Sequence, residues 1–288
     1  MRDSITFPEI LEIKHSTFSL VDVQRSGKSA IYNDKSRYLR IGIGPGISND
    51  LHLHKQMQTF GFPVAKLLDE GQHEGMLYFI EESLGDEHFG EIFKNDISAS
   101  GEISGSSFQQ FIDVSKKFVE SQVKTITTKP NWESFKIGIH LDKIVEELPE
   151  QADAIMLRYE KVEERLGAFP TGLLHGDFGP FNMYPKGIID LESSFFGPVG
   201  YDIGSIMEFS NWFPESPHDG YYQTYKFTDE QKVRFYEIMD RVYIERDLPK
   251  ISDYTSEFNF VKGIWFAVGM DHLPNLQKFR FKVLTSLL

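Results

Sequence analysis

Four polar residues in one short stretch of the sequence have the types and spacing that phosphoryl transfer requires. Within the triplet His175-Gly176-Asp177, the aspartate stands five residues before Asn182 and thirteen residues before Asp190. Transfer from a magnesium nucleotide needs a carboxylate beside the incoming hydroxyl and oxygen ligands on the metal. Asn amide and Asp carboxylate oxygens are hard donors of the kind magnesium prefers. The pattern therefore predicts a kinase-type catalytic centre.

Two short apolar runs flank these residues and are expected to position them. Leu173–Leu174 and Gly187–Leu191 read as buried strands with the polar groups at their ends. Strand alternation would place Glu192 on the same face as Asp190, where it could assist the metal or pair with a surface cation. Taken alone, an HGD triplet is more often a polar turn, and a single strand-end aspartate is common. The combination favours catalysis.

The stretch from Leu173 to Met207 resembles the aminoglycoside phosphotransferase/choline kinase family, and FFGPVGYDIG is also similar to methylthioribose kinases. The family's catalytic loop, H-G-D-x-x-x-x-N, stands here as HGDFGPFN, and its metal motif as IDLE. The resemblance implies that Asp177 is the catalytic base, that Asn182 and Asp190 bind magnesium, and that His175 holds the loop's shape. Asp202 matches a later family aspartate; at a helix start it would cap exposed amides.

The N-terminal segment predicts a β-meander, which is the usual start of a kinase small lobe. Thr17–Gln24, Ser29–Asn33 and Arg37–Ile43 read as its strands. In the first turn, at Ser26 and Gly27, backbone amides could lie over the phosphates of a nucleotide. On the third strand, Arg40 is the candidate cation for the α- and β-phosphates. The alternative for Arg40 is an exposed strand arginine.

The next predicted element is a helix over Asp50–Phe60. In the family this helix usually supplies a glutamate that pairs with the third-strand cation. The nearby residues here are Asp50 and His52, so the sequence departs from the family at this ion pair. His52 and His54 do not share a helical face, which assigns them to the surface or to packing rather than to a metal.

Strands at Val64–Leu68 and Met76–Glu82 would complete a five-stranded sheet. The chain then crosses at Glu81–Gly85, which in the family is the hinge whose backbone groups bind adenine. By that resemblance, nucleotide contacts are expected from Glu81 and Ser83. The predicted division is a nucleotide-binding lobe over residues 1–82 and a lobe with the catalytic loop and acceptor site over residues 83–288.

The remainder of the chain has helical periodicity, so the predicted fold class is α+β, with a bilobal protein-kinase-like architecture. Two capping boxes, at Ser106 and at Thr228, mark helix starts. Beyond these two helices, the expected helices cover residues 139–147, 150–166, 201–212, 253–270 and 275–287.

Composition excludes several classes of function. The 288 residues contain no cysteine, so disulfides and zinc–thiolate sites are excluded. A net charge of −13 argues against a nucleic-acid partner. No apolar run approaches the ~20 residues of a membrane span, and the N-terminus lacks the apolar core of a signal peptide. A cytoplasmic monomer or homodimer without a membrane partner is expected.

The sequence thus predicts a kinase that uses ATP (or GTP) and Mg²⁺ to phosphorylate a hydroxyl of a small molecule. The alternative is a nucleotide-binding regulator with weak or no catalysis, which the departure near Arg40 motivates. The acceptor is expected to be neutral or cationic, such as an amino sugar, an aminoglycoside or an amino alcohol. The part after Gly85 is acidic, the part after the catalytic loop is aromatic, and Lys186 is the only Lys or Arg between Leu173 and Gly220. Core aromatics and a solvated acidic surface are the alternative.

Overall fold

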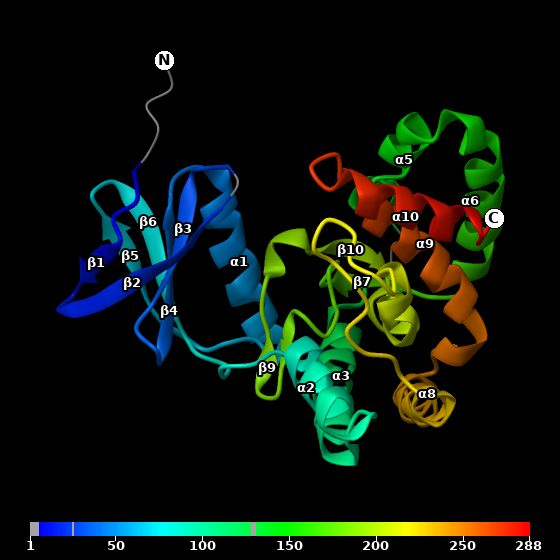
Figure 1. Ribbon diagram of the computed structural model, residues 1–288, viewed down its shortest axis with the longest axis horizontal. Helices are drawn as coiled ribbons and strands as arrows, with labels where there is room; N and C mark the ends of the chain where they lie inside the picture. The colour runs from blue at the N-terminus through cyan, green and yellow to red at the C-terminus, as the bar shows by residue number, and fades with distance from the viewer. Residues whose placement is uncertain (1–5, 25, 128–130) are drawn as a thin grey trace.

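The computed structural model describes residues 6–24, 26–127 and 131–288. Its N-terminal part is a curled antiparallel β-sheet with one helix, and its C-terminal part is mainly helical (Figure 1). The predicted α+β class with a β-rich part followed by a helical part is therefore confirmed. Within these residues, no helix is both long enough and apolar enough to cross a membrane.

The sheet has six strands in the order β1-β2-β3-β4-β6-β5, one more than predicted. The strands are β1 Ile10–Ile13, β2 Ser16–Val23, β3 Ser29–Asn33, β4 Arg37–Gly42, β5 Leu67–His73 and β6 Met76–Glu82. The two strands at the edges account for the differences. β1 is only four residues long, and β5 starts three residues later than expected with a largely polar sequence, LLDEGQH. Edge strands bury little apolar surface, so alternation marks them weakly.

Helix α1 (Pro45–Phe60) lies between the sheet and the helical part (Figure 1). It begins five residues before the predicted start, because Pro45 is tolerated in a first helical turn. Its buried Ile47 and Leu51 pack against Phe79 of β6, and it ends at Gly61 in the left-handed conformation. One face of α1 is thereby fixed to the sheet, while another approaches the 3₁₀ segment η3 (Leu191–Ser193) of the helical part.

The C-terminal part surrounds two small β-ribbons with helices. One ribbon pairs β7 (Thr171–Leu174) with β10 (Phe195–Pro198), and the other pairs β8 (Met183–Tyr184) with β9 (Gly187–Ile188). The α-helices are α2 Phe89–Ser100, α3 Gly105–Gln122, α4 Trp132–Gly138, α5 Leu141–Glu147, α6 Ala152–Leu166, α7 Tyr201–Gly204, α8 Asp229–Ile244, α9 Thr255–Ala267 and α10 Pro274–Thr285. Short 3₁₀ segments are η1 Val123–Thr125, η2 Pro149–Gln151, η3 Leu191–Ser193, η4 Ile206–Trp212 and η5 Ile251–Tyr254.

Helix starts were predicted with mixed success. The capping box at Thr228 is confirmed, since its side chain and that of Gln231 bond reciprocally to the backbone. The box at Ser106 is wrong, because Ser104 is the N-cap and accepts a bond from the Ser107 amide. Ser106 lies inside the first turn of α3. The helix expected at 201–212 divides at Ser205 into α7 and η4.

The two parts meet where the segment after α1 contacts β9. The Ile188 amide donates to the Pro63 carbonyl at 2.7 Å, and Val64 forms a parallel bridge with Ile188. Gly187 lies against the same carbonyl, so a Cβ there would overlap the Pro63 oxygen. The absence of a side chain at Gly187 lets the ribbon that precedes Asp190 reach the N-terminal part.

Gly187→Ala should therefore destabilise the protein. The added methyl group overlaps backbone rather than a flexible side chain, so the free energy of unfolding should fall by about 1–3 kcal/mol. Urea denaturation monitored by circular dichroism measures this. Gly105→Ala is the matched control, since a Cβ at Gly105 meets open space and should be neutral or slightly stabilising. Equal stability of the two variants would contradict the tight junction.

Candidate active site

The predicted catalytic loop, which follows β7, is held in place by one buried carboxylate. Asp202, at the start of α7, accepts bonds from the backbone amides of His175 and Gly176 and from Gln122 Nε2, each at 3.0 Å. Its side chain caps no amide of α7, so the predicted capping of its own helix is wrong, because its oxygens are used by the loop. Burial raises the pKa of Asp202 to about 6, against the charge of Lys262 and these bonds.

His175 connects the loop to the segment that precedes Asp190. Its Nε2 lies 2.8 Å from the Ile189 carbonyl, to which it donates in the neutral tautomer. The side chain is fully buried beside the rings of Phe118 and Phe178. Burial lowers the pKa of His175 to about 4. A neutral histidine thus ties together two loops that carry acidic residues.

Asp177 and Asn182 are in direct contact. Asn182 Nδ2 donates to both the backbone oxygen and Oδ2 of Asp177, each at 2.9 Å. The amide oxygen of Asn182 is left for another partner. Burial raises the pKa of Asp177 above its ordinary value, although the charge of Lys262 opposes this shift.

Asp190 follows β9 in an unusual conformation. Its φ of 64° is left-handed, and the chain continues into η3 rather than along a strand. The predicted strand over Gly187–Leu191 is therefore wrong after Ile188, and so is the alternation argument for Glu192. Glu192 nevertheless faces the sheet, where Gln24 Nε2 donates to Glu192 Oε2 at 3.4 Å. Burial, followed by the charge of Asp190, raises the pKa of Glu192.

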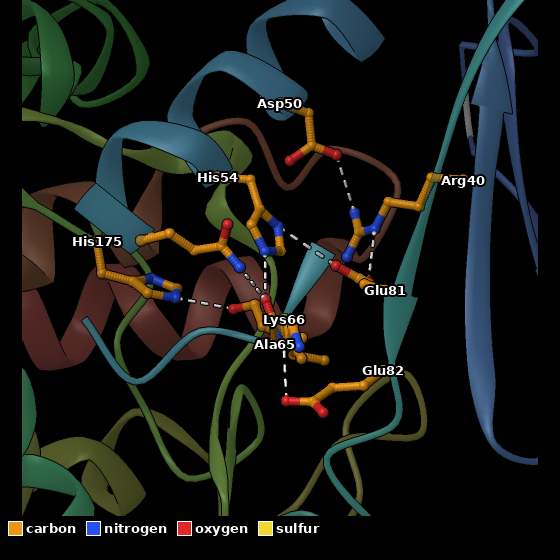
Figure 2. Close-up of polar contacts among 10 residues, drawn as sticks. Arg40, Asp50, His54, Ala65, Lys66, Glu81, Glu82 and His175 are labelled. Carbon is orange, nitrogen blue, oxygen red and sulfur yellow. Dashed lines mark hydrogen bonds and ion pairs between the residues drawn. The ribbon is translucent and has the colours of Figure 1, made fainter. Parts of the chain in front are cut away.

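Arg40 on β4 is buried between two carboxylates (Figure 2). Its Nη1 lies 3.2 Å from Asp50 Oδ2, and its Nε lies 3.3 Å from Glu81 Oε1. Burial alone would lower the pKa of Arg40, but the charges of Glu81 and Asp50 raise it above its ordinary value. His54 points from α1 into the same group, with Nδ1 3.4 Å from Glu81 and Nε2 2.6 Å from the Ala65 carbonyl. This sequence lacks the helix glutamate that is usual in the family, and Asp50 supplies a carboxylate for the ion pair with Arg40 instead.

The expected nucleotide-contacting residues fall in different places. Glu81 lies in β6, within the predicted strand and opposite Tyr38 and Leu67. Its side chain pairs with Arg40, and its contact with a nucleotide stays a prediction. Ser83 does lie in the crossover, and its amide donates to the Ser36 carbonyl at 2.9 Å. Ser26 and Gly27 form the β2–β3 turn, where the Gly27 amide bonds back to the Gln24 carbonyl at 2.8 Å.

Two cavities meet at Ser193, which lines both. The smaller, of about 320 Å³, lies between the sheet, α1 and η3 and is lined by Gln24, Arg40, Asp50 and Glu192 among others. The larger, of about 670 Å³, contains Asp177 and Asn182 and has aromatic walls. The catalytic loop therefore lies in the larger cavity, while Arg40 and Glu192 line the smaller one.

Two cations of the site were missed by sequence reasoning. Lys262 of α9 is buried, donates to the Gly176 carbonyl and lies 4.4 Å from the Trp265 ring centroid. Burial lowers its pKa, whereas the charges of Asp177 and Asp202 raise it. A lone lysine in the apolar run FNFVKGIWFA was a usable signal, since lysine is rarely buried without a partner. Arg280 of α10 lines the larger cavity, and its surroundings, QKFRFKV, carry no such signal.

Comparison with known proteins agrees with this geometry. Residues 45–236 match the sequence profile of the phosphotransferase enzyme family. The chain belongs to this family. Among curated proteins, none matches the sequence.

Solved structures share the fold of this family member at low sequence identity. A choline/ethanolamine kinase family protein from Mesorhizobium loti has a TM-score of 0.60 and 14% identity, with 94% of this chain and 87% of that chain covered. Aminoglycoside phosphotransferase APH(4)-Ia, in a ternary complex with ADP and hygromycin B, has a TM-score of 0.56 and 12% identity, over 94% and 92%. Plasmodium vivax ethanolamine kinase has a TM-score of 0.54 and 15% identity, over 94% and 83%. At such identities these likenesses show the fold alone.

The burial of neutral His175 should make stability depend on pH. Because the folded-state pKa of about 4 lies below the ordinary value of 6.5, His175 stabilises the fold above pH 6.5 and this contribution is lost as pH falls toward 4. Between about pH 7.5 and about pH 5 the loss should be about 2 kcal/mol. Urea denaturation of the protein and of His175→Gln at both pH values measures the free energy of unfolding and isolates the contribution of His175. An identical pH dependence in the variant would refute the assignment.

Proposed function

We propose that this phosphotransferase uses a magnesium nucleotide, ATP or GTP, to phosphorylate a hydroxyl of a small molecule. The observation that carries the proposal is the contact of Asp177 with Asn182 in a cavity that adjoins the one containing Arg40. The nucleotide phosphates would occupy the smaller cavity, beside Arg40. The acceptor would occupy the larger cavity, and the phosphoryl group would pass between them near Ser193.

The residues present fit a magnesium ion. Asn182 keeps its amide oxygen available because its nitrogen is used on Asp177, and the Asp190 carboxylate caps no amide of η3. No cage of three or more His, Cys, Asp or Glu side chains exists within residues 6–24, 26–127 and 131–288. That suits magnesium, which commonly binds one or two carboxylates, phosphate oxygens and water. When bound, it would neutralise charge on the transferring phosphoryl group.

Asp177 would act as the base. The acceptor hydroxyl would lie against its carboxylate and give up its proton there, as the hydroxyl oxygen bonds to the terminal phosphorus. The bond from that phosphorus to the bridging oxygen breaks, and the nucleoside diphosphate leaves. Asn182 holds Oδ2 of the base, while Asp202 and Lys262 hold the backbone on which it stands.

Arg40 would hold the nucleotide phosphates. It is oriented by Asp50 and Glu81 and lines the smaller cavity. A guanidinium fixed in this way loses little conformational freedom when it binds phosphate. The alternative of a regulator without catalysis was motivated by Arg40 itself and by the missing helix glutamate. Asp50 provides a carboxylate for the ion pair, which argues against the second of these two reasons.

Separate substitutions of the two proposed functional carboxylates, Asp177 and Asp190, should have different effects. Asp177→Asn should leave binding of magnesium nucleotide nearly intact and lower kcat by about 10²–10⁴, the usual value of general base catalysis. Asp190→Ala should also weaken magnesium-dependent nucleotide binding, because a metal ligand is lost. Radiolabelled ATP turnover across a pool of hydroxylated metabolites, with nucleotide titration calorimetry, measures both. Equal and small effects would count against these roles.

Arg40→Ala should raise the nucleotide KM at least about tenfold, since hydrogen bonds to a charged group are worth ~1.5–3 kcal/mol. Arg40→Lys should recover part of the loss. The control is Arg37→Lys on the same strand, because Arg37 pairs with Asp34 away from the cavity. Alanine leaves Asp50 and Glu81 unpaired, so thermal denaturation must accompany the kinetics. An unchanged KM in folded Arg40→Lys and Arg40→Ala would assign Arg40 to structure only.

A further inference from the structure

Three aromatic rings that line the larger cavity already face the protein's own cations. Lys262 Nζ lies 4.4 Å from the Trp265 ring centroid and 5.1 Å from that of Phe266. The Arg280 guanidinium lies 5.0 Å from the Phe266 centroid and 5.2 Å from that of Phe213. An ammonium group from a ligand would use the same attraction to the ring faces. At these three rings it would meet a like charge.

Arg280 is held rigidly but keeps one amino group for a ligand. Its Nε donates to the Trp212 carbonyl at 3.3 Å, and its Nη1 donates to the Phe266 carbonyl and to Met270 Sδ. The residue is only 6% exposed. Nη2, in contrast, makes no hydrogen bond to any residue in the described part of the chain and is not among its fully buried polar atoms without a partner. Arg280 lines the larger cavity.

The charges around the larger cavity favour an anionic rather than a cationic ligand. Of the described residues that line it, only Asp177 is a carboxylate, and its role as base already requires it. Arg280 lines the same cavity, and burial lowers its pKa only to about 10, so it is protonated at neutral pH. One premise of the expected neutral or cationic acceptor, beside the acidic and aromatic character of this part of the chain, was the lack of a nearby Lys or Arg apart from Lys186. The folding of α9 and α10 brings two such cations to the site.

We propose that the acceptor carries an anionic oxygen group, a carboxylate or a phosphate, which binds Arg280 Nη2 while its hydroxyl lies against Asp177. This proposal rests on the proposed function, because it identifies the class of acceptor for the same site. A charge-assisted hydrogen bond to a pre-oriented guanidinium would fix one end of the ligand. The aromatic walls would pack on its carbon skeleton, and the hydroxyl would be the only part presented to the base.

The first arm of the test uses the unmodified protein and no nucleotide. Calorimetry compares four compounds with the same six-carbon polyol skeleton: gluconate, glucose 6-phosphate, glucose and glucosamine. At least one of the two anions should bind about tenfold or more tightly than both glucose and glucosamine, as expected for a charge-assisted contact. The pair of anions distinguishes carboxylate from phosphate. Tighter binding of glucosamine, or no preference for either anion, would overturn the proposal.

The second arm asks whether Arg280 is responsible. Arg280→Lys and Arg280→Met should each weaken binding of the preferred anion about tenfold, because the contact with Nη2 is lost, and should change glucose binding little. Arg241→Lys, on the exposed face of α8, is the matched control and should change neither. Anion affinity that is unchanged in folded Arg280→Lys would overturn the proposal. The first arm decides alone if both variants fail to fold.

A turnover assay then separates this proposal from the proposed function. Binding of an anion through Arg280 without transfer from ATP or GTP would refute the kinase assignment and leave the anion site standing. Transfer to neutral or amino acceptors only, with the same KM in Arg280→Lys, would refute the anion site and leave the kinase assignment standing. Transfer to an anionic acceptor with a raised KM and a largely preserved kcat in Arg280→Lys would support both.

Discussion

The geometry of the site depends on one buried carboxylate. Asp202 accepts hydrogen bonds from two successive backbone amides of the catalytic loop and from the side chain of Gln122 at the end of α3. Burying a carboxylate without such donors would cost free energy, and so would burying the amides without an acceptor. Each therefore requires the other, and together they hold the backbone that carries Asp177. Lys262 adds a bond to the carbonyl of Gly176 in the same loop.

Around this loop, the charges of the site are arranged in two groups that belong to different parts of the chain. Arg40, Asp50 and Glu81 form a buried group on the sheet and α1. Lys262 and Arg280 approach the loop from α9 and α10. Removing one partner of a buried charge pair is generally costly, because the other charge remains without compensation. The two groups thus preserve the positions of the cations on either side of Ser193.

The family's ion pair is made here by a different residue. Asp50 reaches Arg40 because α1 begins early, at Pro45, and presents its second turn to β4. The aspartate side chain is shorter than that of glutamate, but the arginine side chain is longer than that of lysine, so the two still meet. Glu81 then neutralises the second edge of the guanidinium. His54 Nδ1 lies 3.4 Å from Glu81, and His54 Nε2 lies 2.6 Å from the carbonyl of Ala65, in the segment that leads to the junction with β9. The substitution therefore involves a set of residues rather than a single pair.

The local chemistry of the site could be predicted from the sequence. The spacing of Asp177, Asn182 and Asp190 and the apolar runs beside them are properties of one continuous segment, as is the reciprocal cap at Thr228, so no long-range contact was needed to recognise them. The existence of β1 and the bounds of β5 could not be predicted, because edge strands carry little apolar alternation. Which cations reach the site depends instead on long-range packing. Lys262 and Arg280 are far from the catalytic loop in the chain, and the packing of α9 and α10 into one core, which no local pattern encodes, brings them to it.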